Sequence, residues 1–127
     1  MCADILLVDD NAIQAATRKA ILSRLGRSVA VADDGMKALG LVDEQEGSSA
    51  VRLVLTDHLM PGMNGPEFVR RLRERLPGVP VLVLSGLAEA EDAYEGLDVT
   101  FRLKPLPPSE LLELVRTLLQ EPMVKTA

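Results

Sequence analysis

The chain has 127 residues and a formal net charge of −5 at pH 7. Hydrophobic residues make up 47% of it but aromatic residues only 2%, which predicts one domain with an aliphatic core. The negative charge disfavours nucleic acid and membrane as direct partners, because both are bound largely through basic patches. The single cysteine, Cys2, has no disulfide partner, and no apolar run approaches the roughly 20 residues of a membrane helix. We therefore expect a cytoplasmic protein.

In the first half of the chain, predicted strands alternate with predicted helices. Residues 5–8, and residues 51–55 apart from Arg52, are apolar without polar alternation, which predicts strands buried on both faces, as in a parallel sheet. Residues 29–32 form a weaker strand candidate. Apolar spacing of three to four residues predicts a first helix ending at Gly26, with an inward stripe of Ile13, Thr17, Ala20, Ile21 and Leu25. Residues 36–46 have the pattern of a shorter helix.

The second half continues this alternation. Phe68, Leu72 and Leu76 predict a helix with Pro66 in its first turn. Its expected exposed face carries Arg70, Arg71, Arg73 and Arg75. Residues 79–84 predict another buried strand, residues 88–95 a short or mobile helix, and residues 99–103 a weak strand.

The last predicted helix has a wide apolar stripe. It follows Pro107 and Pro108, with Ser109 as its expected N-cap. The stripe consists of Leu111, Leu112, Val115, Leu118 and Leu119. Residues 122–127 are expected to form a tail after a single domain of residues 1–121. Strands alternating with helices predict an α/β fold with an open parallel sheet and right-handed crossovers.

Polar residues follow four of the predicted strands. They are Asp9 and Asp10, Asp57, Ser85 and Gly86, and Lys104 and Pro105. Ligands of open α/β sheets sit outside the carboxyl ends of the strands, so these side chains are expected to converge. Each also has an ordinary interpretation: Asp10 as a helix N-cap, Asp57 and Ser85 as turn residues, and Lys104 as a surface charge.

Together these residues predict a cation site with phosphoryl chemistry. Three clustered carboxylates raise one another's pKa values unless a cation neutralises them, and oxygen ligands suit Mg²⁺ or Mn²⁺. A carboxylate such as Asp57 can attack phosphorus when the phosphoryl charge is neutralised, here by a metal ion and Lys104. Ser85 and the Gly86 amide are candidates to bind a phosphoryl oxygen.

Five ordered motifs resemble the receiver domain of two-component response regulators over nearly the whole chain. They are Leu-Leu-Val-Asp-Asp-Asn at residues 6–11, Leu-Thr-Asp at 55–57, Met-Pro-Gly-Met-Asn-Gly at 60–65, Leu-Ser-Gly at 84–86, and Lys-Pro at 104–105. The resemblance implies a doubly wound five-stranded sheet of order 2-1-3-4-5 with five helices. It also implies a sensor histidine kinase or phosphotransfer protein as phosphodonor, and a downstream protein that the sequence does not name.

Residue by residue, the resemblance makes Asp57 the phosphoacceptor and Lys104 the partner of the phosphoryl group. Mg²⁺ would be held by Asp9, Asp10, Asp57 and the Leu59 carbonyl. Ser85 and Phe101 match the family's switch hydroxyl and switch aromatic, although Phe101 could equally be a core residue. The domain would act in signalling and catalyse only its own phosphorylation and dephosphorylation. A cis peptide between Lys104 and Pro105 is expected to aim the lysine into the site.

The chain also departs from the family pattern. Leu59 and Leu87 stand where many members have polar residues, which predicts a long-lived phosphorylated form. The interval from Ser85 to Lys104 is about one helical turn short, so the fourth helix is expected to differ. His58 is expected to be a loop residue at the entry to the site, without a phosphorelay role.

Two rival functions remain. A pseudo-receiver keeps the fold but responds to protein contacts instead of phosphate, and typically lacks an acid or the lysine. A Mg²⁺-dependent phosphatase would need a second aspartate two residues after Asp57, where Leu59 stands.

Overall fold

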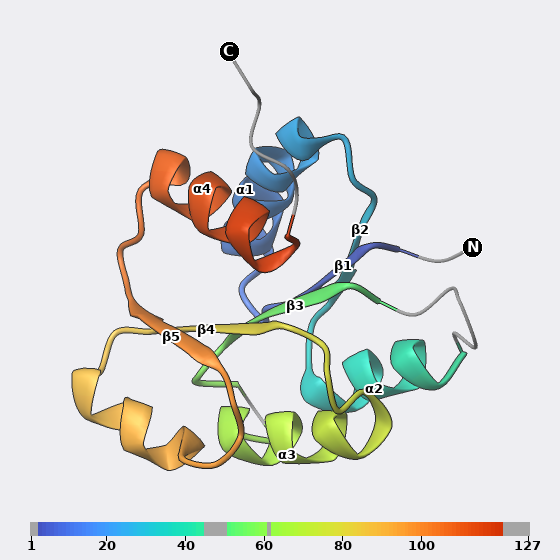
Figure 1. The fold of residues 1–127 in the computed structure, drawn as a ribbon, viewed down its shortest axis with the longest axis vertical. Coiled ribbons are helices and arrows are strands. Elements are labelled where there is room, and N and C mark those ends of the chain that lie inside the picture. Colours follow the sequence, from blue (N-terminus) through green and yellow to red (C-terminus); the bar gives the residue numbers. More distant parts are fainter. Residues whose placement is uncertain (1–2, 45–50, 61, 121–127) are drawn as a thin grey trace.

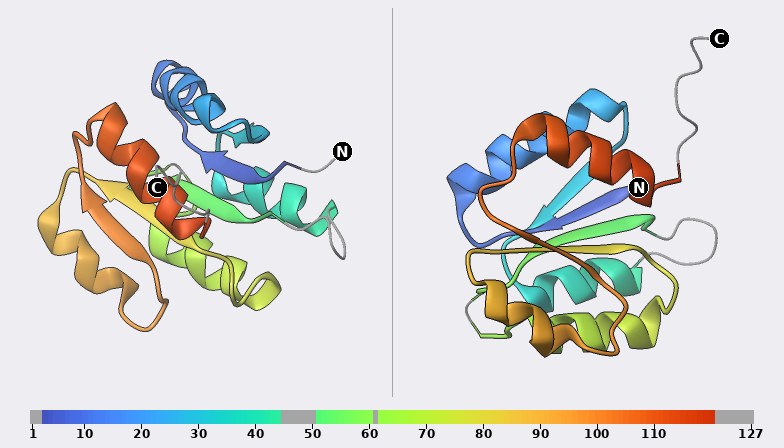
Figure 2. Two further views of the ribbon diagram at one scale, coloured as in Figure 1. Left: turned by 45° about the horizontal axis from the view of Figure 1, so that its top comes forward. Right: turned by 60° about the vertical axis from the view of Figure 1, so that its left-hand side comes forward.

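The computed structural model describes residues 3–44, 51–60 and 62–120. Its centre is a parallel sheet of β1 (Ile5–Val8), β2 (Val29–Ala32), β3 (Leu53–Asp57), β4 (Val81–Ser85) and β5 (Thr100–Leu103). The strand order is β2-β1-β3-β4-β5, which confirms the predicted α/β class and topology. Helices α1 and α4 cover one face of the sheet, and α2, α3 and the 3-10 helix η3 cover the other (Figures 1 and 2).

The strands that were predicted with most clarity from the sequence are the fully buried ones. All residues of the central strands β1, β3 and β4 are buried, whereas the edge strands β2 and β5 are partly exposed. Strands β3 and β4 begin two residues later than predicted. They also end later, β3 by two residues and β4 by one, and so end on the polar residues Asp57 and Ser85. The strands themselves thus carry two of the predicted site residues.

Two hydrophobic layers hold the helices on the sheet. Alternate residues of a strand point to opposite faces. On one face Ile5, Leu55 and Leu84 pack with Leu22 of α1 and Val115 of α4. On the other face, Leu6, Val54 and Val83 pack with Leu39 of α2 and with Phe68 and Leu72 of α3.

Helix α1 (Ala12–Leu22) buries a different face from the predicted one. Ile13 is 81% exposed, Thr17 and Ala20 are exposed too, and the buried residues are Ala15, Arg18 and Leu22. The predicted stripe is therefore wrong for Ile13, Thr17 and Ala20. The stripe was chosen from apolar residues, whereas the inward face of α1 includes an arginine that pairs with buried carboxylates.

The ends of α1 were only partly predicted. Its N-cap is Asn11, whose side chain accepts the Gln14 N–H at 2.9 Å, so Asp10 does not cap it. The helix continues into the 3-10 turn η1 (Ser23–Leu25), and Gly26 closes this turn with a φ of 72°, as the predicted stop requires.

Helices α2 (Gly35–Glu44) and α3 (Gly65–Arg75) lie side by side below the sheet (Figure 1). Residues 45 and 46 of the predicted second helix lie outside the described residues. Asn64 caps α3 by accepting the Glu67 N–H at 2.9 Å, and Pro66 occupies its first turn as predicted.

Helix α4 (Pro108–Leu118) starts without a side-chain cap, because Pro107 occupies the N-cap position. The prediction of Ser109 as N-cap is therefore wrong: the prolines set the start of the helix two residues earlier, and Ser109 lies inside the first turn. The predicted tail, residues 122–127, lies outside the described residues.

The helix between β4 and β5 is the 3-10 helix η3 (Ala88–Tyr94), short as predicted. The loop that follows it is held by Arg73, which was expected to be exposed. Its guanidinium instead donates to the backbone oxygens of Leu97 at 2.9 Å and Asp98 at 2.7 Å. It also donates to carbonyls of the α3–β4 loop, those of Leu76, Pro77 and Val79. Within the described ranges, no helix is long and apolar enough to cross a membrane.

Candidate functional site

The carboxyl ends of four strands meet at one edge of the sheet. The parallel register pairs Val8 with Thr56, Asp57 with Leu84, and Ser85 with Leu103. As a result, Asp9, Asp57, Ser85 and Lys104 lie at this edge. One carboxylate oxygen from each of Asp9, Asp10 and Asp57 lies within 4.8 Å of the others, so the predicted acid cluster forms.

The three acids differ in environment. Asp9 and Asp57 are 1% and 2% exposed, whereas Asp10 is exposed. Burial raises the pKa of Asp9, and the nearby Asp57 raises it further, while hydrogen bonds from the Asn11 N–H and the Gln14 amide act in the opposite direction. An oxygen-only set with two buried members fits a hard divalent cation such as Mg²⁺ or Mn²⁺.

Lys104 reaches the site from the end of β5. Its Nζ lies 3.3 Å from Asp57 Oδ1, and its backbone N–H donates to the Ser85 carbonyl at 2.8 Å. The Lys104–Pro105 peptide is cis, which confirms the prediction. Lys104 thus lies against the predicted acceptor, and its role as partner of the phosphoryl group stays a prediction.

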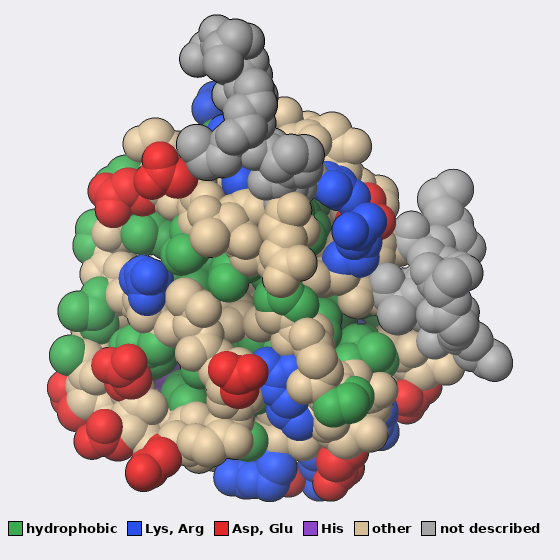
Figure 3. Space-filling view, viewed as in Figure 1, with side chains coloured by type: hydrophobic (Ala, Val, Ile, Leu, Met, Phe, Trp, Pro, Cys, Tyr) green, Lys and Arg blue, Asp and Glu red, His purple; other side chains and the backbone are tan. Residues whose placement is uncertain are grey.

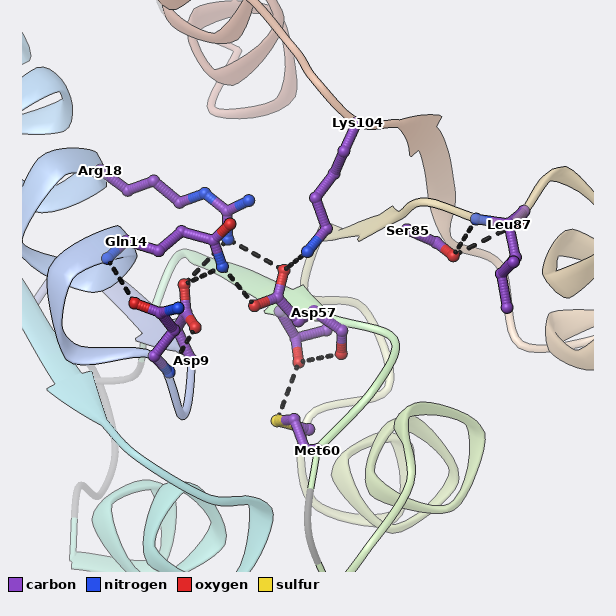
Figure 4. Close-up of polar contacts among 10 residues, drawn as sticks. Asp9, Gln14, Arg18, Asp57, Met60, Ser85, Leu87 and Lys104 are labelled. Carbon is purple, nitrogen blue, oxygen red and sulfur yellow. Dashed lines mark hydrogen bonds and ion pairs between the residues drawn. The ribbon is translucent and has the colours of Figure 1, made fainter.

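Ser85 is buried, but its hydroxyl bonds within its own loop. It accepts the Leu87 N–H at 2.9 Å and lies 3.3 Å from the Leu87 carbonyl oxygen (Figure 4). A Cβ at Gly86 would meet nothing within 4 Å, so no close approach inside the described chain requires glycine there. The phosphoryl-binding roles of Ser85 and Gly86 stay predictions.

Sequence reasoning missed two residues of the site, Gln14 and Arg18 of α1. Arg18 Nη1 lies 3.0 Å from Asp9 Oδ2 and 2.9 Å from Asp57 Oδ1. Gln14 Nε2 donates to Asp9 Oδ2 at 2.9 Å and to Asp57 Oδ2 at 3.0 Å (Figure 4). Their spacing of four residues on the helix after the acid pair was the available signal, because such residues share one helical face.

An aromatic group lies beside the acceptor. His58 Nδ1 and the Tyr94 hydroxyl are 2.7 Å apart and share a hydrogen bond, and the ring of Tyr94 lies 6.1 Å from that of Phe101. Burial raises the pKa of Tyr94, and the charge of Asp57 adds to this. Phe101 packs in the core, which agrees with one of its two interpretations and leaves its switch role a prediction.

The loops at the mouth of the site carry exposed apolar side chains. Leu59 is 68% exposed and Leu87 is 44% exposed. The Leu59 carbonyl, a predicted metal ligand, belongs to the loop after Asp57, and its role stays a prediction.

The fold and the edge site define a signalling receiver module, and comparison with known families agrees. The family model of the response regulator receiver domain matches residues 5–116. The chain therefore belongs to the response regulator receiver domains.

Similar proteins place the chain among two-component regulators. It is 41% identical over 96 residues to a gliding motility regulatory protein of Myxococcus xanthus, covering 74% of this chain and 12% of that protein. It is 37% identical over 119 residues to the DNA-binding response regulator MtrA of Mycolicibacterium paratuberculosis, covering 91% and 51%. A CheY-like receiver domain structure from Methanospirillum hungatei superposes with a TM-score of 0.82 at 26% identity, covering 95% and 96%.

One prediction about partners is wrong. The net charge led us to exclude nucleic acid, yet MtrA is named as a DNA-binding regulator and the chain spans only about half of its length. The charge of a receiver domain does not describe the partners of a longer protein, because a separate region can bind DNA.

Proposed function

We propose that the domain accepts a phosphoryl group on Asp57 from a sensor histidine kinase or phosphotransfer protein. The observation that carries this proposal is the placement of Asp57: its buried carboxylate lies within 4.8 Å of carboxylate oxygens of Asp9 and Asp10, and 3.3 Å from the Lys104 ammonium. A nucleophile and a positive charge thus meet at one point of the sheet edge.

The transfer exchanges one bond to phosphorus for another. A carboxylate oxygen of Asp57 forms the new O–P bond while the N–P bond of the donor's phosphohistidine breaks, and the electron pair returns to the imidazole, which takes up a proton. Lys104 neutralises charge on the phosphoryl oxygens. Burial of Asp57 limits access of bulk water to the acyl phosphate.

The acid cluster is proposed to hold the divalent cation. Asp9, Asp10, Asp57 and the Leu59 carbonyl would be its ligands from the protein. When bound, Mg²⁺ or Mn²⁺ supplies positive charge that offsets the phosphoryl oxygens. Ser85 and Phe101 are proposed to report the phosphorylated state. Ser85 follows Leu84, which pairs with Asp57, and Phe101 lies on the next strand, β5, where it pairs with Val83.

The longer protein is proposed to act through a further region. MtrA is a DNA-binding response regulator, and the chain covers 51% of its length. By analogy, phosphorylation here would control a region outside this domain whose target is nucleic acid. The domain itself would stay a signalling module whose only reactions are its own phosphorylation and dephosphorylation.

The test is phosphorylation by acetyl phosphate with Mg²⁺, followed by intact mass measurement. The wild type should gain one phosphoryl group, and Asp57→Asn should gain none. Removing Mg²⁺ with a chelator should also prevent labelling of the wild type.

Asp92→Asn is the matched control, because Asp92 is an exposed acid on η3. It should label like the wild type. Undiminished labelling of Asp57→Asn would refute the assignment of the acceptor, and a wild type without labelling would favour the pseudo-receiver function.

A further inference from the structure

A cation of the protein itself already bridges the two buried acids. Arg18 Nη1 contacts Asp9 Oδ2 and Asp57 Oδ1 at 3.0 and 2.9 Å, and the side chains of the three residues are 10%, 0% and 3% exposed. A buried charge is tolerated only when it is paired, and Arg18 is paired with both carboxylates at once. It therefore stabilises the close approach of Asp9 and Asp57.

Gln14, one helical turn before Arg18, also contacts both Asp9 and Asp57. Its Nε2 contacts Asp9 Oδ2 at 2.9 Å and Asp57 Oδ2 at 3.0 Å. With the Asn11 N–H on Asp9 Oδ1 at 2.9 Å, all four oxygens of the two carboxylates have donors. A divalent cation that binds Asp9 and Asp57 must displace some of these donors.

The net charge of the site also indicates that Arg18 opposes the binding of a cation. At this site the carboxylates of Asp9, Asp10 and Asp57 contribute a charge of −3, and Arg18 and Lys104 contribute +2, so the net charge that meets an incoming cation is −1. Without Arg18 the same group of residues would carry −2. The guanidinium also contacts the oxygens that the cation needs, so its repulsion acts at short range and is weakly screened by salt.

The structure offers Arg18 a place to move. A cavity of about 560 Å³ lies beside the site, and its lining includes Gln14, Arg18 and Lys104. Most of the remaining lining residues are apolar, among them Ile21 of α1, Leu84 of β4 and Leu111 of α4. A displaced guanidinium could enter this space without unfolding α1.

We propose that Arg18 is a built-in counter-ion that competes with the divalent cation for Asp9 and Asp57. It holds the acids together without metal and moves toward the neighbouring cavity when metal binds. This inference rests on the metal site of the proposed function. Arg18 would thereby raise the metal concentration that the domain needs before Asp57 becomes reactive.

The test measures Mg²⁺ affinity of the full chain by calorimetry, without any phosphodonor. Arg18→Gln keeps amide donors but removes the charge, and it should bind Mg²⁺ at least about tenfold more tightly, or about 1.4 kcal/mol. Arg18→Lys keeps the charge and should stay within about threefold of the wild type, as 0.7 kcal/mol or less corresponds to that factor.

Lys19→Gln is the matched control, because it removes one charge from the exposed side of the same helix. Its Mg²⁺ affinity should equal that of the wild type. Equal affinities for the wild type and Arg18→Gln, or tight binding by Arg18→Lys, would overturn the competition. Weaker binding by Arg18→Gln would also overturn it, since Arg18 would then be arranging the metal ligands.

Folding can be separated from binding in the same experiment. If Arg18→Gln is unfolded without metal, it should regain its circular dichroism at Mg²⁺ concentrations too low to saturate the wild type. Failure to regain it would refute the proposal. A wild type that is not phosphorylated, beside an Arg18→Gln variant that binds Mg²⁺ more tightly, would refute the proposed function and leave the competition standing.

Discussion

Two groups of side chains with opposite chemistry lie near Asp57. On the acid side, Asp9, Gln14 and Arg18 surround its carboxylate with charges and amide hydrogens. On the aromatic side, His58, Tyr94 and Phe101 link the loop after β3 to η3 and β5 through one hydrogen bond and ring contacts. The acid side sets the charge around the acceptor, whereas the aromatic side fixes the position of the loop that follows it.

The largest effect is expected at Gly65 on the aromatic side. A Cβ there would overlap the Tyr94 hydroxyl and lie 3.0 Å from the His58 carbonyl oxygen. Gly65→Ala should therefore destabilise the domain by about 1–3 kcal/mol in urea unfolding, the range for overpacked sites.

Gly40→Ala is the control for this substitution. Gly40 lies inside α2, and a Cβ there meets nothing within 4 Å, so alanine should stabilise the helix by up to about 1 kcal/mol. Adding Tyr94→Phe to Gly65→Ala should recover part of the lost stability. No recovery would show that the hydroxyl is not the obstacle.

The exposed leucines in the loops after β3 and β4, Leu59 and Leu87, are expected to control the lifetime of the phosphorylated form. Leu59 and Leu87 offer no hydrogen bond to a water attacking the phosphoryl group. The double variant Leu59→Asn with Leu87→Glu should lose phosphate about tenfold faster, since one hydrogen bond to the attacking water is worth about 1.4 kcal/mol of barrier.

Decay of the phosphorylated protein, followed by intact mass at fixed pH and Mg²⁺, measures this rate. Val31→Thr changes another exposed apolar residue, on the edge strand β2, and should leave the rate unchanged. A double variant that decays no faster than the wild type would show that the leucines do not set the lifetime.

A smaller effect is expected from the hydrogen bond between His58 and Tyr94. Tyr94→Phe removes it and should cost about 1 kcal/mol of unfolding free energy. A double-mutant cycle with His58→Ala isolates this interaction. Strictly additive losses would mean that the two side chains contribute independently.

The last expected effect is the ionisation of Tyr94, the one tyrosine of the chain, which leaves stability at neutral pH unchanged. Burial, assisted by the charge of Asp57, raises its pKa in the folded state. The unfolded chain then loses this proton near pH 10 while the folded chain keeps it, so stability falls as the pH rises above about 10. The absorbance of the tyrosinate should appear near pH 10 when the protein is unfolded in denaturant, and at a higher pH when the protein is folded.

The sequence predicted the central part of the fold better than its borders. Strands β1, β3 and β4 are buried on both faces, and their apolar runs showed this directly. The start of α4 was misassigned because Ser109 is a good cap by type, whereas Pro107 holds the cap position by its backbone. Cap preferences are averages, and two consecutive prolines override them.

The site was predicted where residues follow strands and missed where they lie on a helix. Asp9, Asp57 and Lys104 come together because parallel register fixes the strand ends. Arg18 was missed because an arginine in a helix is normally assigned to the exposed face. Only the tertiary position of α1 above Asp9 and Asp57 makes its burial favourable.

The two ends of η3 are fastened to different parts of the molecule. At its start, the Leu87 N–H is held by the Ser85 hydroxyl at 2.9 Å. Just beyond its end, Arg73 of α3 holds the carbonyls of Leu97 and Asp98. Tyr94, the last residue of η3, is also tied to His58 of the loop after β3 by a hydrogen bond. Reorientation of the Ser85 hydroxyl would therefore loosen the start of η3, while the contacts of Tyr94 and Arg73 keep its end in place.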